Sequence, residues 1–236
     1  ITEEVVSKYL IKKEMLAEKL GPAVRGNQFP TQVALNVHGL PVNAEIEYAL
    51  DPFSQVQIQK QLEQYSPDYA AFVAVDATTG RVLSMASYTS DEKMKGQNLA
   101  VQATFPAASI FKVVTASAAI DMKKVNPDSV VPFNGANHTL YKKNVKDTSV
   151  NRWTRFMTLK EAFGRSVNVF FGKLGLYYVG PQGLAQYAQR YKFNEKIESD
   201  MLIDSGAARI PNDDGWAVVQ AASGFTQDNT MSPMQG

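Results

Sequence analysis

Two residues with complementary chemistry lie three positions apart in an otherwise uncharged stretch. Lys112 is the only charged residue between Gly96 and Ile120, and Ser109 precedes it by three positions. On a helix, positions i and i+3 share a face with Cβ atoms roughly 5–6 Å apart, so the serine hydroxyl could reach the lysine amine. Burial among apolar neighbours lowers the pKa of a lysine from its free value of about 10.4. Because a neutral lysine is a good general base, the pair predicts a serine nucleophile activated without histidine.

A predicted helix positions this pair. Pro106 is expected to begin the helix, which continues to about Lys123 and is apolar nearly all round between Ala107 and Ile120, as is typical of a buried helix. Ser109 then lies in the first helical turn. Backbone N–H groups there have no helical acceptor and could stabilise an oxyanion.

The spacing alone is not specific. A chain of this length shows about one Ser-x-x-Lys pattern by chance, and a second one is indeed formed by Ser90 and Lys93. The two residues between them are acidic, which predicts an exposed segment and a protonated lysine. The alternative for Lys112 is a structural lysine that extends its charged end from a core helix to the solvent.

A serine and an asparagine two positions apart form the second candidate group. Ser166 and Asn168 lie at the start of a predicted helix, so the hydroxyl could relay a proton and the amide could hold the lysine and the substrate. The alternative is that Ser166 only caps the helix. The same three residue types occur at 149–151, in a polar loop that no apolar helix follows.

The composition excludes several other chemistries. The 236 residues carry a formal net charge of +1 with no basic stripe, so nothing indicates nucleic-acid binding. The absence of cysteine excludes disulfides, thiol catalysis and cysteine-ligated zinc. His38 and His138, the two histidines, lie outside any nucleophile-elbow pattern and are interpreted as loop residues.

The sequence predicts an N-terminal lobe or linker at 1–47, followed by a larger domain at 48–236. Within the lobe, residues 3–20 are predicted to form an amphipathic helix that ends at Gly21-Pro22, and 21–47 are predicted to be irregular. No apolar run could span a bilayer and no signal peptide is recognisable. Because the chain starts at Ile1, we expect the natural N-terminus, with any membrane anchor, to lie outside it.

The larger domain alternates helices, a hairpin and loops. Strands are predicted at 69–75 and 81–88 around a turn, and 124–157 are predicted to be mostly loop. Thr158 and Glu161 form a capping-box pattern. Further helices are predicted at 51–62, 158–164, 166–177 and 181–191, the last being the final clear helix.

Taken together, these segments resemble the penicillin-binding transpeptidase family, whose motifs are Ser-x-x-Lys, Ser-x-Asn and Lys-Thr-Gly or Lys-Ser-Gly. The resemblance covers about 47–236 in the family's order. Besides the two motifs, it rests on Glu47–Asp51 with Gln55, Ala74–Ala86, Asn98–Ala100, Phe105–Lys112, Met157–Asn168 and Ser232–Gln235.

Three departures from the family pattern are visible. Ala108 stands where a glycine commonly precedes the nucleophile, and Ser223-Gly224-Phe225 replaces a stretch of the Gly-Gln-Gly type. No Lys-Thr-Gly or Lys-Ser-Gly occurs. We therefore expect 48–236 to be a partial domain that ends before the third motif.

The resemblance implies an α+β fold, with an antiparallel sheet flanked by helices, an all-helical subdomain, and the C-terminal part of the sheet missing. It implies an extracytoplasmic DD-transpeptidase that cross-links peptidoglycan stem peptides, is acylated by β-lactams, works beside other wall-synthesis proteins, and needs no metal or cofactor. Ser109 would be the nucleophile, Lys112 its base, Ser166 the proton relay and Asn168 the positioning group. The alternatives are a DD-carboxypeptidase, a β-lactam sensor, a serine β-lactamase, or a catalytically silent scaffold of a wall-synthesis complex.

Overall fold

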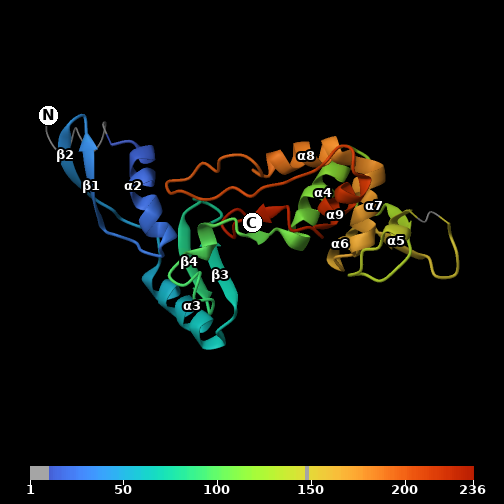
Figure 1. Cartoon of the computed structure of the whole chain (residues 1–236), viewed down its shortest axis with the longest axis horizontal. Coiled ribbons are helices and arrows are strands. Elements are labelled where there is room, and N and C mark those ends of the chain that lie inside the picture. Colours follow the sequence, from blue (N-terminus) through green and yellow to red (C-terminus); the bar gives the residue numbers. More distant parts are fainter. Residues whose placement is uncertain (1–10, 147–148) are drawn as a thin grey trace. The chain divides into compact units, whose positions relative to one another are not determined.

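A computed structural model describes residues 11–146 and 149–236, which form two compact units (Figure 1). The first unit contains the described residues up to Gln102 together with Ile197–Asp204 and Ser232–Gln235. The second contains Ala103–Lys196 and Ser205–Met231. Each unit buries its own apolar core, and the predicted division after residue 47 remains a prediction.

The first unit begins with a helix and a hairpin. Helix α2 spans Lys13–Arg25, and strands β1 (Gln32–Val37) and β2 (Leu40–Glu45) pair antiparallel. His38 and Gly39 connect the strands with positive φ angles of 51° and 86°, the backbone of a tight hairpin turn. The prediction of an irregular segment at 21–47 was therefore wrong, because a His-Gly pair is a weaker turn signal than Asn-Gly.

The predicted end of the first helix was also wrong. Pro22 lies inside α2, which continues to Arg25. Leu20 and Val24 are both buried in the core of the first unit, so tertiary packing outweighs the cost of a proline within a helix. Positions 3–10 of the predicted helix at 3–20 lie outside the described residues.

The rest of the first unit follows the prediction. Helix α3 (Pro52–Tyr65) is capped by Asp51, whose carboxylate accepts from the backbone N–H of Ser54 at 2.7 Å. Strands β3 (Tyr69–Val75) and β4 (Val82–Thr89) pair antiparallel, which confirms the hairpin.

The second unit is mainly helical (Figure 1). Its core joins apolar residues of α4, α7, α8 and α9 and the segments between them. In chain order its elements are β5 (Phe105–Pro106), a 3₁₀ turn (Ala108–Ile110), α4 (Phe111–Asp121), β6 (Val130–Phe133), α5 (Lys142–Lys146), β7 (Arg155–Thr158), α6 (Leu159–Gly164), α7 (Asn168–Lys173), a π-helical segment (Leu174–Val179), α8 (Gly180–Arg190), α9 (Gly215–Ser223) and β8 (Thr230–Met231).

Several helix boundaries in this unit differ from the prediction. Pro106 does not begin a helix but pairs with Thr230 in the β5–β8 ladder. The nucleophile helix is not buried all round, since Ile110 is 54 % and Ile120 41 % exposed. Helix α9 was not predicted, because its nine residues are too short for periodicity to identify it. The capping box of α6 is confirmed, with Thr158 and Glu161 bonded reciprocally.

The α+β class is confirmed. Among the described residues, the sheets are four antiparallel pairs, and these combine with the helices of both units. In the part of the chain that the structure describes, no helix has the length and apolar character needed to cross a membrane.

Candidate active site

The side chain of Ser109 lies on an exposed turn at the start of the nucleophile helix. Ser109 occupies the middle of the 3₁₀ turn that precedes α4, one turn earlier than the α-helix itself. Ala108, directly before it, has a left-handed φ of 47°. Non-glycine residues seldom adopt this conformation, so surrounding contacts must hold the turn in place.

Lys112 is buried and bonded to polar groups at its charged end. Only 2 % of the residue is exposed. Its Nζ donates to Ser109 Oγ at 2.8 Å and to Asn168 Oδ1 at 2.8 Å, and it lies 5.9 Å from the centre of the Phe171 ring. Burial lowers the pKa of Lys112 from 10.5 to about 8. Lys112 is therefore not a structural lysine whose charged end extends to the solvent.

Ser166 contacts the hydroxyl of Ser109. Its Oγ donates to Ser109 Oγ at 3.1 Å. Val167, not Ser166, occupies the N-cap position of α7, and Ser166 has a left-handed φ of 52°. The capping interpretation of Ser166 was therefore wrong.

Asn168 connects Lys112 to a loop of the same unit. Its Nδ2 donates to the carbonyl of His138 at 2.9 Å, and its backbone N–H donates to the carbonyl of Asn137 at 2.7 Å. Arg155 Nη1 in turn donates to Asn137 Oδ1 at 2.6 Å. The loop at 137–138 and Arg155 were missed by sequence reasoning, because a backbone carbonyl leaves no signal in residue type.

The structure brings together the four predicted residues, and the two other matches to these motifs, at 90–93 and 149–151, make different contacts. Ser90 and Lys93 lie in the first unit, where the Ser90 hydroxyl bonds to Asp68 and Lys93 is exposed. The match at 149–151 lies in a loop in which Asn151 accepts from the N–H of Trp153 at 2.8 Å.

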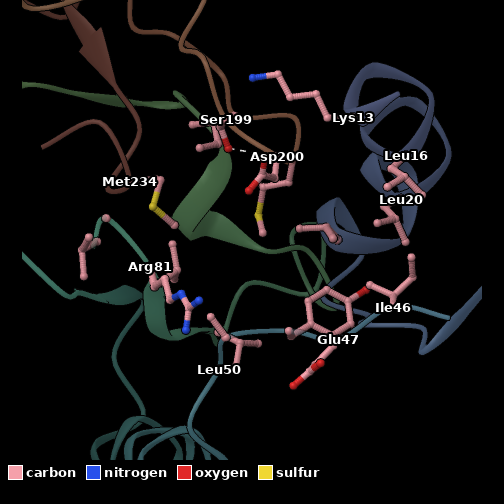
Figure 2. Close-up of a pocket in the computed structure, with 18 of the residues that line it drawn as sticks. Lys13, Leu16, Leu20, Ile46, Glu47, Leu50, Arg81, Ser199, Asp200 and Met234 are labelled. Carbon is pink, nitrogen blue, oxygen red and sulfur yellow. Dashed lines mark hydrogen bonds between the residues drawn. The ribbon is translucent and has the colours of Figure 1, made fainter. Parts of the chain in front are cut away.

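A cavity is present in the first unit. It has a volume of about 930 Å³ (Figure 2). Apolar side chains such as Leu16, Leu20 and Met234 meet charged ones such as Lys13 and Arg81 around it. No group of three or more side chains suited to hold a metal ion occurs among residues 11–146 and 149–236.

The chain is similar to known proteins in family, sequence and structure. Residues 70–236 match the family model for the penicillin binding protein transpeptidase domain. Stage V sporulation protein D of Bacillus subtilis is 25 % identical over 210 residues, which are 84 % of this chain and 32 % of that protein. Penicillin-binding protein PbpB of Mycolicibacterium smegmatis is 27 % identical over 198 residues, 77 % of this chain and 30 % of that protein.

Solved structures show the same fold. Penicillin-binding protein A from M. tuberculosis, in its penicillin G acyl-enzyme complex, matches with a TM-score of 0.60 and 21 % identity over 79 % of this chain and 49 % of that one. Pseudomonas aeruginosa PBP2, in complex with WCK 5153, matches with a TM-score of 0.60 and 21 % identity over 79 % and 48 % of the two chains.

The chain spans about a third of the length of the curated relatives that it matches. The family model covers well over half of the chain, and it includes both motifs that the sequence singled out. The chain belongs to the penicillin-binding protein transpeptidase family.

Proposed function

We propose that the protein is a peptidoglycan DD-transpeptidase in which Ser109 forms an acyl-enzyme with a D-Ala-D-Ala stem peptide. The observation that carries this proposal is the 2.8 Å separation of Lys112 Nζ and Ser109 Oγ, with a buried lysine whose pKa is lowered to about 8. With a pKa of about 8, roughly a tenth of the lysine is neutral at pH 7, and the neutral amine is the form that a general base requires.

Acylation begins with proton transfer from Ser109 to Lys112. The neutral amine accepts the hydroxyl proton across the 2.8 Å contact while it still donates to Asn168 Oδ1 at 2.8 Å. Ser109 Oγ then bonds to the carbonyl carbon of the penultimate D-Ala. The backbone N–H of Ser109, in the turn that precedes α4, is the proposed oxyanion donor, since N–H groups at a helix start have no helical acceptor.

Breakdown of the tetrahedral intermediate needs a proton for the leaving amine. Ser166 lies 3.1 Å from Ser109 Oγ and is the proposed relay from Lys112 to the departing D-Ala. The C–N bond breaks, D-Ala leaves as the neutral amine, and the acyl group stays on Ser109. An amine of a neighbouring stem peptide then attacks the ester, gives its proton back through the same groups, and releases Ser109.

Asn168 is the proposed positioning group for Lys112 and for the substrate. Its carbonyl oxygen holds Lys112, and its amide nitrogen is anchored to the His138 carbonyl. Because the side chain is fixed at both ends, the lysine amine has little freedom to turn away from Ser109.

The named relatives support this proposal. Three of them are penicillin-binding proteins, and the structure of one of these three is a penicillin G acyl-enzyme complex. We therefore propose β-lactams as covalent ligands, stem peptides as substrates, wall-synthesis proteins as partners, and an extracytoplasmic location.

Covalent labelling tests the proposal directly. A fluorescent penicillin should attach to the full-length protein, and peptide mapping by mass spectrometry should find the adduct on Ser109. Ser109→Ala should abolish the adduct, and Ser90→Ala should leave it unchanged. An adduct on Ser90, or none on the wild-type protein, would contradict the proposal.

A synthetic stem peptide tests the transfer step. With an acceptor amine present, the protein should release D-Ala and form a cross-linked product. Release of D-Ala with hydrolysis alone would identify a carboxypeptidase, and turnover of the penicillin itself would identify a β-lactamase.

A further inference from the structure

Gly224 lies directly against the backbone of the nucleophile turn. It ends α9 in the left-handed conformation, with φ 69°, and its N–H donates to the carbonyl of Ala221 at 2.9 Å. A Cβ atom at this position would overlap the carbonyl oxygen of Ala108 and would lie 3.1 Å from the backbone nitrogen of Ser109. No side chain larger than hydrogen fits between the two backbones.

The chain around Gly224 contacts the nucleophile segment on both sides of this point. Before Ser109, the N–H of Ala107 donates to the carbonyl of Asn229 at 2.7 Å. After Ser109, the hydroxyl of Thr115 on α4 donates to the carbonyl of Ala222 at 2.8 Å. The segment 222–231 therefore supports the turn before, at and after the nucleophile.

The turn needs such support. Ala108 has a left-handed φ of 47°, which an alanine adopts only when its surroundings impose it. The Gly224 backbone lies against the carbonyl of this same residue. If the contact were forced open, Ala108 would be free to relax and would carry the following residue, Ser109, away from Lys112.

We propose that Gly224 is a positioning residue for the Ser109 nucleophile. Because Gly224 has no side chain, the end of α9 can pack directly against the Ala108 carbonyl. This contact holds Ser109 Oγ within hydrogen-bonding distance of Lys112 and Ser166. The inference rests on the proposed acylation of Ser109 and adds to it a residue that bears no functional group.

The chain offers a matched control. Gly180, in the same unit, has a left-handed φ of 76°, and a Cβ there would meet nothing within 4 Å. Gly180 has ψ 166°, a region that essentially only glycine adopts, whereas Gly224 has ψ 24° in the ordinary left-handed helical region. Gly180→Ala therefore carries at least as much backbone strain as Gly224→Ala, and only Gly224→Ala also forces two backbones apart.

A second pair of variants loosens the same contact without a collision. Thr115→Val removes the hydrogen bond to the Ala222 carbonyl and keeps the shape of the side chain, whereas Thr115→Ser keeps the hydroxyl. This pair remains informative even if Gly224→Ala folds poorly.

The experiment measures acylation of the full-length variants by a fluorescent penicillin, with the noncovalent dissociation constant and the acylation rate constant determined separately, beside thermal melting. We expect Gly224→Ala to lose about 10²-fold in the acylation rate constant, as a displacement of roughly 1 Å would cause. The dissociation constant should stay near the wild-type value. Thr115→Val should also slow acylation, and Gly180→Ala and Thr115→Ser should not.

Equal acylation rate constants for Gly224→Ala and Gly180→Ala, or for Thr115→Val and Thr115→Ser, would overturn the inference while the proposed function stood. If the wild-type protein were not acylated on Ser109, the proposed function would fail and the inference with it.

Discussion

At the scale of single residues, the chemistry depends on how one lysine is kept both buried and bonded. Lys112 is withdrawn from solvent, which disfavours its ammonium form, and its amine donates to two oxygen atoms at 2.8 Å. The two acceptors are the side chains of Ser109, in the turn before α4, and Asn168. Perturbing the lysine alone should therefore change the reaction more than the fold.

The pH dependence of acylation should report the titration of Lys112. Burial lowers its pKa to about 8, and only the neutral amine can accept the proton of Ser109. The acylation rate should therefore fall about tenfold per pH unit well below that pKa and level off above it. Stopped-flow measurements with a fluorescent penicillin between pH 6 and 9.5 would check this. A rate constant that does not change over this range would contradict the assignment of Lys112 as base.

Replacement of the lysine by arginine tests the same role without removing the positive charge. Arginine does not deprotonate in proteins, so Lys112→Arg should slow acylation by at least about 10²-fold. Lys93→Ala, in the exposed second Ser-x-x-Lys pattern, is the control and should acylate at the wild-type rate. A Lys112→Arg protein that acylates normally would make the lysine structural.

At the scale of elements, the loop between β6 and α5 supports the start of α7. Asn168 bonds to this loop through both its backbone and its side chain, and Arg155 on β7 holds the loop through Asn137. Hydrogen bonds connect strand β7 to the loop and the loop to helix α7. A substitution on β7 should therefore alter the position of the Lys112 amine.

Arg155→Met tests this connection. The variant keeps an apolar side chain over the Phe133 ring and removes the bond to Asn137. A hydrogen bond of this kind is worth about 1 kcal/mol, so we expect a loss of that size in the free energy of unfolding and acylation slower by up to roughly fivefold.

The control for Arg155→Met is Arg152→Met. Arg152 also covers an aromatic ring, that of Trp153 at 4.7 Å. Chemical denaturation and penicillin acylation should be measured for both variants. Equal behaviour of the two would show that the bond from Arg155 to the loop has no part in positioning Asn168.

At the scale of the whole molecule, stability and chemistry are distributed over two units. The described residues of the first unit have a core of their own, which includes Leu20 of α2. The four candidate residues all belong to the second unit, whose core is built on α4, α7, α8 and α9. Damage to the first core should therefore lower stability without altering the reacting groups.

Leu20→Ala is the corresponding variant. Leu20 is 6 % exposed, and truncation of a buried leucine costs about 2–5 kcal/mol in the free energy of unfolding. The folded protein should still acylate at the wild-type rate at low temperature. Leu40→Ala, at a residue 47 % exposed, is the control and should change stability little. If Leu20→Ala slowed acylation as strongly as it lowered the melting temperature, the two units would not be chemically independent.

Local spacing and apolar context predicted the pairing of the serine with the lysine. Ser109 and Lys112 are three residues apart, and any helical turn brings such side chains together. The capping box of α6 and the hairpin of β3 and β4 were predictable for the same reason, since their signals span only a few neighbouring residues. The apolar neighbours of Lys112 also predicted its burial and hence the direction of its pKa shift.

Only the tertiary structure decided the contacts between distant segments. Asn168 is 56 residues from Lys112, and the His138 carbonyl that anchors it comes from a loop of no special composition. The close approach of Gly224 to Ala108 joins residues more than a hundred positions apart, and the continuation of α2 through Pro22 depends on the burial of Val24. Periodicity and capping describe interactions within one element, whereas these contacts arise when separate elements pack, which residue types in sequence do not encode locally.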